Sequence, residues 1–474
     1  MPPDVIIAGA GPTGLLLANE LALAGVRTIV LEKDLERGGQ SRALNLQPRT
    51  AEVLDLRGLL DPIAEQAVAT LPTGHFAGIP LDYSVFGTRF PYQVGIPQAR
   101  VERFLEDRLA AYGVPVLRGH ELTGLAQDAD GVTATVAGPD GTATLRAAYL
   151  VGADGGRSRV RGALGVGFPG RDGRISLAVA DIVPEPHEAL PTEWRLPSFD
   201  VGGGPFLIPL GDGVHRFLFA APDQAVDREA PVTAEEVRTA LATGPGPHLA
   251  LRELRWASRF TDASRQADRY AVDRVLLAGD AAHIHFPAGG QGLNLGMQDA
   301  FNLGWKLAAT VRGHAPRGLL DTYHTERHPV GAAVLENTRA QLALLNPDDD
   351  VRALRSLVSG LLAEPAANRR IAGMISGLDI RYPMPPGTPA HPLLGTRLPN
   401  IQLPTARGLF LTRTPTPSLH TAIAPWRGRV DHTTLPDLPA DALLLRPDGH
   451  VCWAGTPTTA GLRPALHHWF GPAS

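Results

Sequence analysis

Apolar runs and glycine-rich turns alternate over the first part of the chain. Val5 to Ala8 is an apolar run of strand length, and the turn from Gly9 to Gly14 follows it. Leu15 to Ala24 then has the apolar content of a buried helix, and Arg27 to Glu32 is a second strand-like run. This order predicts a strand, a helix and a strand that are joined by a right-handed crossover in a parallel sheet.

The next stretch mixes helical segments with short, aromatic-rich ones. Helices are predicted from Pro48 to Leu60 and from Arg100 to Tyr112, and strands with hairpin turns at Asp130-Gly131 and Asp140-Gly141 follow them. Residues 71–97 predict an irregular loop or short strands. The aromatic residues of this stretch that are candidates to line a ligand cavity are Phe76, Tyr83 and Phe86.

A β-rich insert is predicted for residues 176–270. Phe206 to Leu210 and Val214 to Ala220 read as a hairpin, whose Phe206 and Phe217 are further candidates to line a substrate cavity. A strand from Val275 to Asp280 and a long helix from Gly292 to Val311 then resume the earlier pattern. We therefore expect one discontinuous domain, 1–175 with 271–390, around the insert 176–270, and a C-terminal domain, 391–474.

Composition and charge exclude several classes of function. Of the 474 residues 44% are hydrophobic and 19% are charged, and the net charge is −4, so a polycationic nucleic-acid-binding protein is not expected. The single cysteine, Cys452, excludes an internal disulfide, a CxxC pair and a thiolate metal site. With neither a signal peptide nor a membrane-spanning run in view, a cytoplasmic protein is expected.

The glycine turn has the spacing of a dinucleotide-binding site. Gly9, Gly11 and Gly14 form a GxGxxG that follows a strand and opens a helix, and Glu32 ends the second strand. Glycines let a pyrophosphate approach the amides of the helix N-terminus, and a carboxylate at the end of the second strand can hold ribose hydroxyls. A plain structural turn is the alternative, but the strand, helix and acid together favour a bound dinucleotide.

Two further motifs carry a resemblance to a known family. Asp154 to Arg161 matches the pattern DGxxSxxR, and Gly279-Asp280 with Pro287 to Asn294 matches the GD pattern of single-component (class A) FAD-dependent aromatic hydroxylases. Within that family, the segments 75–83, 96–98 and 391–395 are most similar to hydroxylases of aromatic polyketides of the angucycline and anthracycline type. The chain is also similar to the rifampicin monooxygenases.

The resemblance implies a fold and a reaction. The fold would be α/β, with a Rossmann-like FAD-binding domain of the para-hydroxybenzoate hydroxylase type, a β-sheet substrate domain and a C-terminal thioredoxin-like domain. NADPH or NADH would reduce FAD, and O2 would then form a flavin C4a-hydroperoxide that hydroxylates a multi-ring aromatic polyketide, as in antibiotic biosynthesis. The cofactor carries that chemistry, so no catalytic base is assigned.

The same resemblance, together with the motif chemistry, gives the expected site residues. Asp280 would hold the ribityl hydroxyls, although a helix cap is its alternative, and the segment from Gly289 to Asn294, which opens the long helix, would turn the positive end of that helix to the flavin. Asp154 and Arg161 are also candidates for NAD(P)H, with a surface ion pair as the alternative. The full predicted FAD-binding set is Gly9, Gly11, Pro12, Thr13, Gly14, Glu32, Lys33, Arg42, Gln98, Leu122, Asp154, Asp280, Pro287, Gly290, Gly292, Leu293 and Asn294.

Other interpretations stay open. His283 and His285 could form a metal or acid–base pair, but packed or hydrogen-bonded histidines are favoured. Because no dedicated Rossmann domain for NAD(P)H is in view, NAD(P)H is expected to bind transiently. A rifampicin-type, antibiotic-inactivating monooxygenase, a Baeyer–Villiger oxygenation and a non-catalytic dinucleotide sensor are the alternative functions. A small aromatic molecule is the expected partner, without nucleic acid or membrane, for a monomer or a homodimer.

Overall fold

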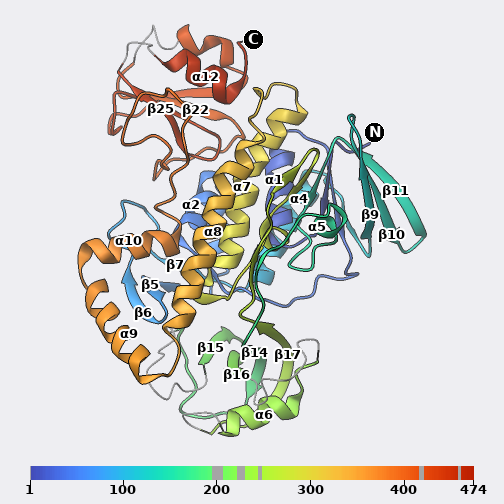
Figure 1. Ribbon diagram of the computed structural model, residues 1–474, viewed down its shortest axis with the longest axis vertical. Coiled ribbons are helices and arrows are strands. Elements are labelled where there is room, and N and C mark those ends of the chain that lie inside the picture. Colours follow the sequence, from blue (N-terminus) through green and yellow to red (C-terminus); the bar gives the residue numbers. More distant parts are fainter. Residues whose placement is uncertain are drawn as a thin grey trace.

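The computed structural model describes residues 2–194, 206–220, 230–243, 248–415, 421–456 and 461–473. Three bodies follow one another along the long axis of the molecule (Figure 1). An α/β body with two long helices lies in the middle, a β-sheet with one helix lies at the bottom, and the C-terminal segment, drawn in red, lies at the top.

A six-stranded sheet forms the core of the middle body. Its order is β19-β20-β12-β1-β2-β8, and every pairing is parallel except that of the edge strand β19. The inner strands are continuous apolar runs because both faces of a parallel sheet are covered. The strands are β1 (Val5–Ala8), β2 (Thr28–Glu32), β8 (Val116–Arg118), β12 (Tyr149–Gly152), β19 (Ala271–Val272) and β20 (Val275–Leu277).

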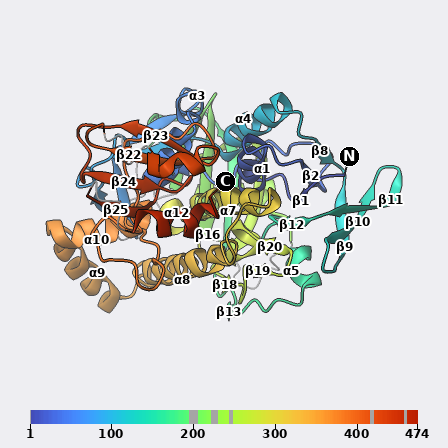
Figure 2. The ribbon, with the colours of Figure 1, turned by 90° about the horizontal axis from the view of Figure 1, so that it is seen from above.

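Two helices bring the N-terminal and later parts of this body together. Helix α1 (Pro12–Leu23) packs along α7 (Gln291–Val311), and Gly304 allows the close approach because a Cβ there would lie 2.6 Å from Glu20 Cβ. Helix α8 (Thr322–Ala343) runs beside α7, as both views show (Figures 1 and 2). The remaining helices of the body are α2 (Pro48–Leu56), α3 (Leu60–Ala64), α4 (Gln98–Ala111) and α5 (Arg159–Ala163).

The insert forms an antiparallel sheet of its own, in the order β15-β16-β14-β17, with α6 (Ala234–Thr243) packed against it. Its hairpin turns at Gly211 to Gly213, as the sequence predicts. The strands are β14 (Ser176–Pro184), β15 (Phe206–Gly211), β16 (Val214–Ala220) and β17 (Leu251–Thr261).

Smaller sheets surround the central one. The hairpin β5–β6 packs against α9 (Asp349–Leu362) and α10 (Pro365–Ser376), while β9–β11 form a three-stranded meander. The strands are β3 (Asn45–Leu46), β4 (Ala69–Leu71), β5 (Thr73–Phe76), β6 (Ile79–Asp82), β7 (Gln93–Gly95), β9 (Glu121–Gln127), β10 (Val132–Gly138), β11 (Gly141–Ala147), β13 (Gly170–Arg171), β18 (Ser264–Gln266) and β21 (His283–Ile284).

The C-terminal body is a four-stranded mixed sheet in the order β23-β22-β24-β25, with α12 (Leu462–Phe470) packed against it. Its core contains the side chains of Trp426, Trp453 and Trp469 together with Trp305 of α7. The strands are β22 (Gly408–Thr412), β23 (Val430–Thr434), β24 (Ala442–Leu445) and β25 (Val451–Gly455).

Two predicted elements differ from the structure, and a left-handed glycine explains each. The predicted strand from Val275 to Asp280 ends at Leu277, because Gly279 has φ +61° and opens a 3-10 turn, Gly279–Ala281. The predicted helix from Pro48 to Leu60 is two helices, α2 and α3, because Gly58 at φ +66° interrupts it.

Candidate functional site

The glycine turn after β1 forms an open cradle at the N-terminus of α1. A Cβ on Gly9 would lie 2.3 Å from the Ala153 carbonyl oxygen, and one on Gly14 would lie 2.0 Å from the Gly9 carbonyl oxygen, so both positions require glycine. Gly11 differs, because a Cβ there would meet nothing within 4 Å. No side chain caps α1, which begins at Pro12, so its first amides face open space of the kind that a phosphate group fills.

The carboxylate of Glu32 lies against this turn at the end of β2. It accepts hydrogen bonds from the amides of Ala10, at 2.9 Å, and Asp34, at 3.0 Å. The next residue, Lys33, extends to the surface, where it pairs with Asp34 at 2.8 Å, and this hydrogen bond raises the pKa of Lys33. The structure therefore joins Glu32 to the glycine turn and gives Lys33 a partner of its own.

Thr13 brings the glycine turn, the GD turn and α7 together. A Cβ on Gly279 would lie 2.7 Å from Thr13 Oγ1, and a Cβ on Gly296 of α7 would lie 2.4 Å from the same atom. Asp280 follows Gly279 with an exposed side chain, and no hydrogen bond or ion pair reaches it from the described residues. Its carboxylate is free to accept hydrogen bonds from a ligand.

The turn before α7 has two left-handed glycines, Gly289 at φ +70° and Gly290 at φ +62°. No side chain caps the helix. Gly292 and Leu293 in its first turn are half-buried, whereas Pro287 is exposed. Asn294 is buried, and its amide donates to the carbonyls of Asn45 and Gly290, at 3.1 and 2.8 Å. Asn294 therefore braces the turn.

Gln98 anchors the loop that carries Arg42. The Gln98 amide donates to the Ala43 carbonyl at 3.0 Å, and the Ala43 amide donates to Gln98 Oε1 at 3.1 Å. Arg42 is exposed, and no contact to its guanidinium is recorded within the described part of the chain. Leu122 lies in the hydrophobic core of the middle body, so only its backbone is available to a ligand.

Asp154 and Arg161 do not pair with each other. Asp154 accepts from the Ser158 hydroxyl at 2.5 Å and from the Val160 amide at 3.1 Å, which fixes the start of α5. Arg161 donates to the carbonyls of Gly156 and Ala281, both at 2.9 Å, and so ties the DG segment to the GD turn. The alternative interpretation, an ion pair between Asp154 and Arg161 at the surface, is therefore wrong.

The two histidines after the GD turn are packed and hydrogen-bonded, which confirms their interpretation. His283 Nε2 lies 2.6 Å from Asp299 Oδ2, which also accepts from the Gly279 amide at 3.2 Å. Arg327 donates to Asp299 Oδ1 at 2.7 Å. Burial alone would raise the pKa of Asp299, but the Arg327 guanidinium holds it below its ordinary value. His285 Nδ1 lies 2.8 Å from the Phe286 carbonyl oxygen.

The aromatic candidates fall into two groups. Phe76, Tyr83 and Phe86 belong to a buried cluster with α9 and α10, and Tyr83 has no exposed surface at all. Strand alternation separates the other two, because Phe217 stacks on Phe219 on the α6 side of the sheet, whereas Phe206 lies on the other side, near Leu44. The packing therefore favours Phe206, rather than the other four, as a cavity-lining residue.

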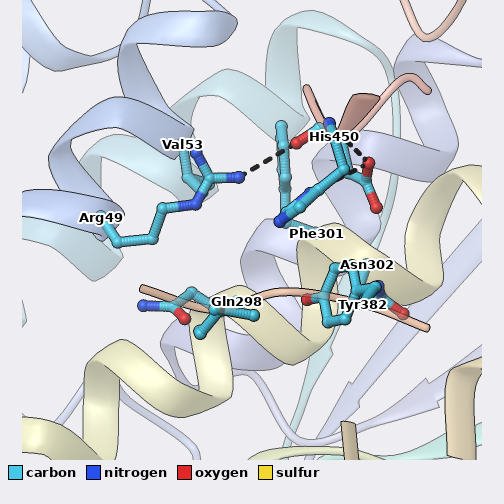
Figure 3. A pocket seen from close by; sticks show the side chains of 9 residues that line it. Arg49, Val53, Gln298, Phe301, Asn302, Tyr382 and His450 are labelled. Carbon is cyan, nitrogen blue, oxygen red and sulfur yellow. Dashed lines mark hydrogen bonds and ion pairs between the residues drawn. The ribbon is translucent and has the colours of Figure 1, made fainter. Parts of the chain in front are cut away.

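Residues of α7 line two cavities. One, of about 380 Å³, is bordered by α7, α8 and α10 and includes Asn294 but no other predicted site residue. The other is water-sized, about 10 Å³, and lies where the C-terminal body meets α2 and α7 (Figure 3). There Arg49 reaches across to donate to the Asp448 carbonyl at 3.1 Å, next to His450.

Sequence reasoning missed a set of buried carboxamides beside the α7 turn. Gln47 donates to the Gly289 carbonyl at 2.7 Å, and Gln93 accepts from Asn45 at 2.6 Å. The available signal was the presence of amide side chains inside short apolar strands, since a buried polar group needs partners.

Comparison with known families matches almost the whole chain. The model of the FAD binding domain family matches residues 3–338, and that of the C-terminal domain of aromatic-ring hydroxylases matches residues 391–473. Both the cradle at Gly11 and the free Asp280 carboxylate fit FAD, which carries a pyrophosphate and a ribityl chain.

Individual relatives are similar over their full length. The chain is 48% identical to 12-dehydrotetracycline 5-monooxygenase/anhydrotetracycline 6-monooxygenase of Streptomyces rimosus, covering 99% of both chains. It is 45% identical to rifampicin monooxygenase of Streptomyces venezuelae, again over 99% of both. The solved structure of the anhydrotetracycline hydroxylase from Streptomyces rimosus superposes with a TM-score of 0.91 at 47% identity over 100% of both chains.

These similarities confirm the predicted fold class, an aromatic-hydroxylase α/β fold with a β-sheet domain and a C-terminal domain. In the ranges that the structure describes, no helix has the length and apolar character needed to cross a membrane.

Proposed function

The chain belongs to the family of FAD-dependent aromatic-ring hydroxylases, and from this membership we propose that it hydroxylates a multi-ring aromatic polyketide at the expense of NADPH or NADH. It is an FAD-dependent monooxygenase, which uses O2. The observation that carries the substrate class is the full-length similarity to a monooxygenase of tetracycline precursors. Residues 1–175 and 271–390 form the proposed FAD-binding domain around the substrate domain, 176–270.

The proposed FAD site uses the open positions of the structure. Gly11 and the N-terminus of α1 would hold the pyrophosphate, Glu32 would hold the adenosine ribose, and the exposed Asp280 would accept hydrogen bonds from the ribityl hydroxyls. When bound, FAD supplies the redox chemistry that activates O2. The chain supplies the positive end of α7, whose uncapped first turn favours negative charge at the flavin edge beside it.

The substrate is proposed to bind between the insert sheet and the Arg42 loop. Phe206, Ile208 and Leu210 of β15 pack toward Leu44, and a Cβ on Gly95 would lie 2.8 Å from Trp194. These apolar groups give the ring system of the substrate a surface from which water is excluded. NAD(P)H is proposed to bind transiently near Asp154 and Arg161.

A pair of glycine variants tests the placement of FAD. Gly11→Ala adds a methyl group that meets no protein atom, so it costs the fold no more than about 1 kcal/mol as a helix cap, yet it enters the proposed pyrophosphate space. We expect FAD affinity to fall at least tenfold. Gly360→Ala in α9, which also meets nothing within 4 Å, is the matched control and should bind FAD normally. Equal affinity in both variants would place the pyrophosphate elsewhere.

Turnover assays separate the candidate substrates. NADPH and NADH oxidation is followed with anhydrotetracycline, angucycline and anthracycline aglycones and rifampicin, and products are analysed by mass. A polyketide product that has gained one oxygen supports the proposal. The 45% identity to a rifampicin monooxygenase supports a second candidate, antibiotic inactivation, which a response to rifampicin alone would favour. If the candidate molecules bind but no oxidised product forms, the chain would instead be a sensor.

A further inference from the structure

A cluster of carboxamides joins the Arg42 loop to the turn that precedes α7, the helix beside which the flavin edge is proposed to lie. This carboxamide cluster consists of Asn45 on β3, Gln47 at the start of α2, Gln93 on β7 and Asn294 on α7. Gln47 is 1% exposed and the other three are buried or half-buried. The Arg42 loop leads directly into β3, and the Gly289 turn leads directly into α7.

Gln47 lies at the centre of the cluster and uses all of its polar groups. Its backbone amide donates to Asn294 Oδ1 at 2.7 Å, and Nε2 donates to the Gly289 carbonyl oxygen at 2.7 Å and to Gln93 Oε1 at 3.2 Å. Its Oε1 accepts from the Tyr83 hydroxyl at 2.9 Å. One side chain thus holds the turn that aims the first amides of α7.

Two backbone carbonyls determine how the amide groups are oriented. The Gly289 carbonyl can only accept, so Gln47 must turn Nε2 toward it and Oε1 toward Tyr83. The Thr73 carbonyl likewise fixes Gln93 Nε2, at 2.7 Å, which leaves Gln93 Oε1 for Asn45 and Gln47. These two acceptors orient Gln47, Gln93 and Asn45, and Asn294 is oriented separately, by the Gln47 backbone amide on its Oδ1 and by the Asn45 and Gly290 carbonyls on its Nδ2.

Tyr83 completes the arrangement from the hairpin side. Its ring crosses over Gly74, where a Cβ would lie 2.1 Å from the hydroxyl oxygen, so only glycine admits it. The hydroxyl must donate, because Gln47 Oε1 can only accept. Burial raises the pKa of Tyr83, which keeps that proton in place.

We propose that Gln47 is a positioning residue that fixes the N-terminal turn of α7 against the flavin, and that the Tyr83 hydroxyl locks the Gln47 amide in the required orientation. The proposal rests on the proposed placement of FAD. A fixed turn keeps the α7 amides aimed at the place where negative charge develops when the flavin is reduced, without reorganisation at that moment. A loosened turn would weaken the binding of reduced flavin more than the binding of oxidised flavin.

The test compares two variants of the same hairpin region. Tyr83→Phe removes only the hydroxyl that locks Gln47. Asn368→Ala removes the side chain of α10 that accepts from the Asp82 amide and donates to the Asp82 carbonyl, both at 2.9 Å, so it loosens the hairpin end without contacting the cluster. Both variants are loaded with FAD, and the midpoint potential of the flavin, its dissociation constant and the melting temperature are measured.

We expect Tyr83→Phe to weaken the binding of reduced relative to oxidised FAD by threefold to tenfold, and tenfold corresponds to a potential lower by about 30 mV for two electrons. Asn368→Ala should lower the melting temperature but leave the potential unchanged. Equal melting losses with unchanged potentials in both variants would show that the cluster is only structural. If Gln47→Met folds and keeps the wild-type potential, the proposal is also overturned. Failure of the wild-type chain to bind FAD would instead refute the placement of the cofactor.

Discussion

Lys306 and Glu326 lie in a fully buried ion network. Substitutions of its members should lower the free energy of unfolding by different amounts. Lys306 Nζ donates to Glu326 Oε2 at 2.7 Å, and Arg446 donates to both oxygens of Glu326, at 2.5 and 2.9 Å. Arg446 also pairs with Asp448. The network joins α7 and α8 to the C-terminal body, and its two cations balance its two anions.

Removing the central anion should cost the most. Glu326→Gln leaves Lys306 and Arg446 with Asp448 as the remaining anion, and an uncompensated buried charge costs about 3–5 kcal/mol. Lys306→Met also leaves one buried anion in excess, but Glu326 then keeps both of its hydrogen bonds from Arg446. Burial lowers the pKa of Lys306 to about 8 despite its pairing with Glu326, so its charge is held at a cost. We therefore expect Lys306→Met to lose less stability than Glu326→Gln.

The stability difference between the wild type and Lys306→Met should depend on pH. The pKa of Lys306 is about 8 in the folded protein, against an ordinary value of 10.5 when exposed. Between these values the unfolded chain binds more protons than the folded one, so the free energy of unfolding rises with pH. The wild type should therefore gain up to roughly 3 kcal/mol relative to Lys306→Met from pH 8 to pH 10.5. Lys33, the other lysine, is present in both proteins, so its titration does not affect the difference in their stability.

Urea unfolding at several pH values, followed by tryptophan fluorescence, measures these differences. The order of stability expected at pH 7 is wild type, then Lys306→Met, then Glu326→Gln. A stability difference between wild type and Lys306→Met that stays constant or shrinks from pH 8 to pH 10.5 would refute the reasoning, because Lys306 would then keep its charge without penalty.

Three further outcomes are expected. Asp280→Ala should weaken FAD binding roughly tenfold to a hundredfold, because hydrogen bonds to a carboxylate contribute about 1.5–3 kcal/mol, and an unchanged titration would remove Asp280 from the site. Phe206→Ala should raise KM for the aromatic substrate in steady-state assays, whereas Phe217→Ala should mainly lower the melting temperature; the reverse pattern would exchange their roles. Burial raises the pKa of the Cys452 thiol, so a thiol reagent at pH 8 should react only after unfolding, and rapid labelling of the native protein would contradict its burial.

The parts of the site that local chemistry dictates could be predicted from the sequence. A Cβ on Gly14 would lie 2.0 Å from the Gly9 carbonyl oxygen, and this local constraint leaves a fixed spacing in the chain. The strand before them and the helix after them are short-range patterns of apolar residues. The hairpin turn at Gly211 to Gly213 is also a short-range pattern, and it lies where the sequence predicts it.

Contacts between distant segments could not be predicted in this way. Gln47 meets Gly289 across 242 positions of sequence, and no periodicity connects them. Alternation places Phe206 and Phe217 on opposite faces of one hairpin, but it does not say which face meets the middle body and which meets α6. Tyr83 reads as a loop aromatic, and only the packing of α10 onto the hairpin shows that it is buried.

The C-terminal body contributes to the site through a buried turn rather than through chemistry of its own. Its single thiol, Cys452, is buried and cannot exchange electrons with a second one. Arg446 forms an ion pair with Glu326 of α8. The next residue of α8, Arg327, donates to Asp299, which also accepts a hydrogen bond from the Gly279 amide. Loss of Arg446 should therefore disturb the GD turn as well as the domain interface, because only three side-chain contacts and one peptide unit separate Arg446 from Gly279.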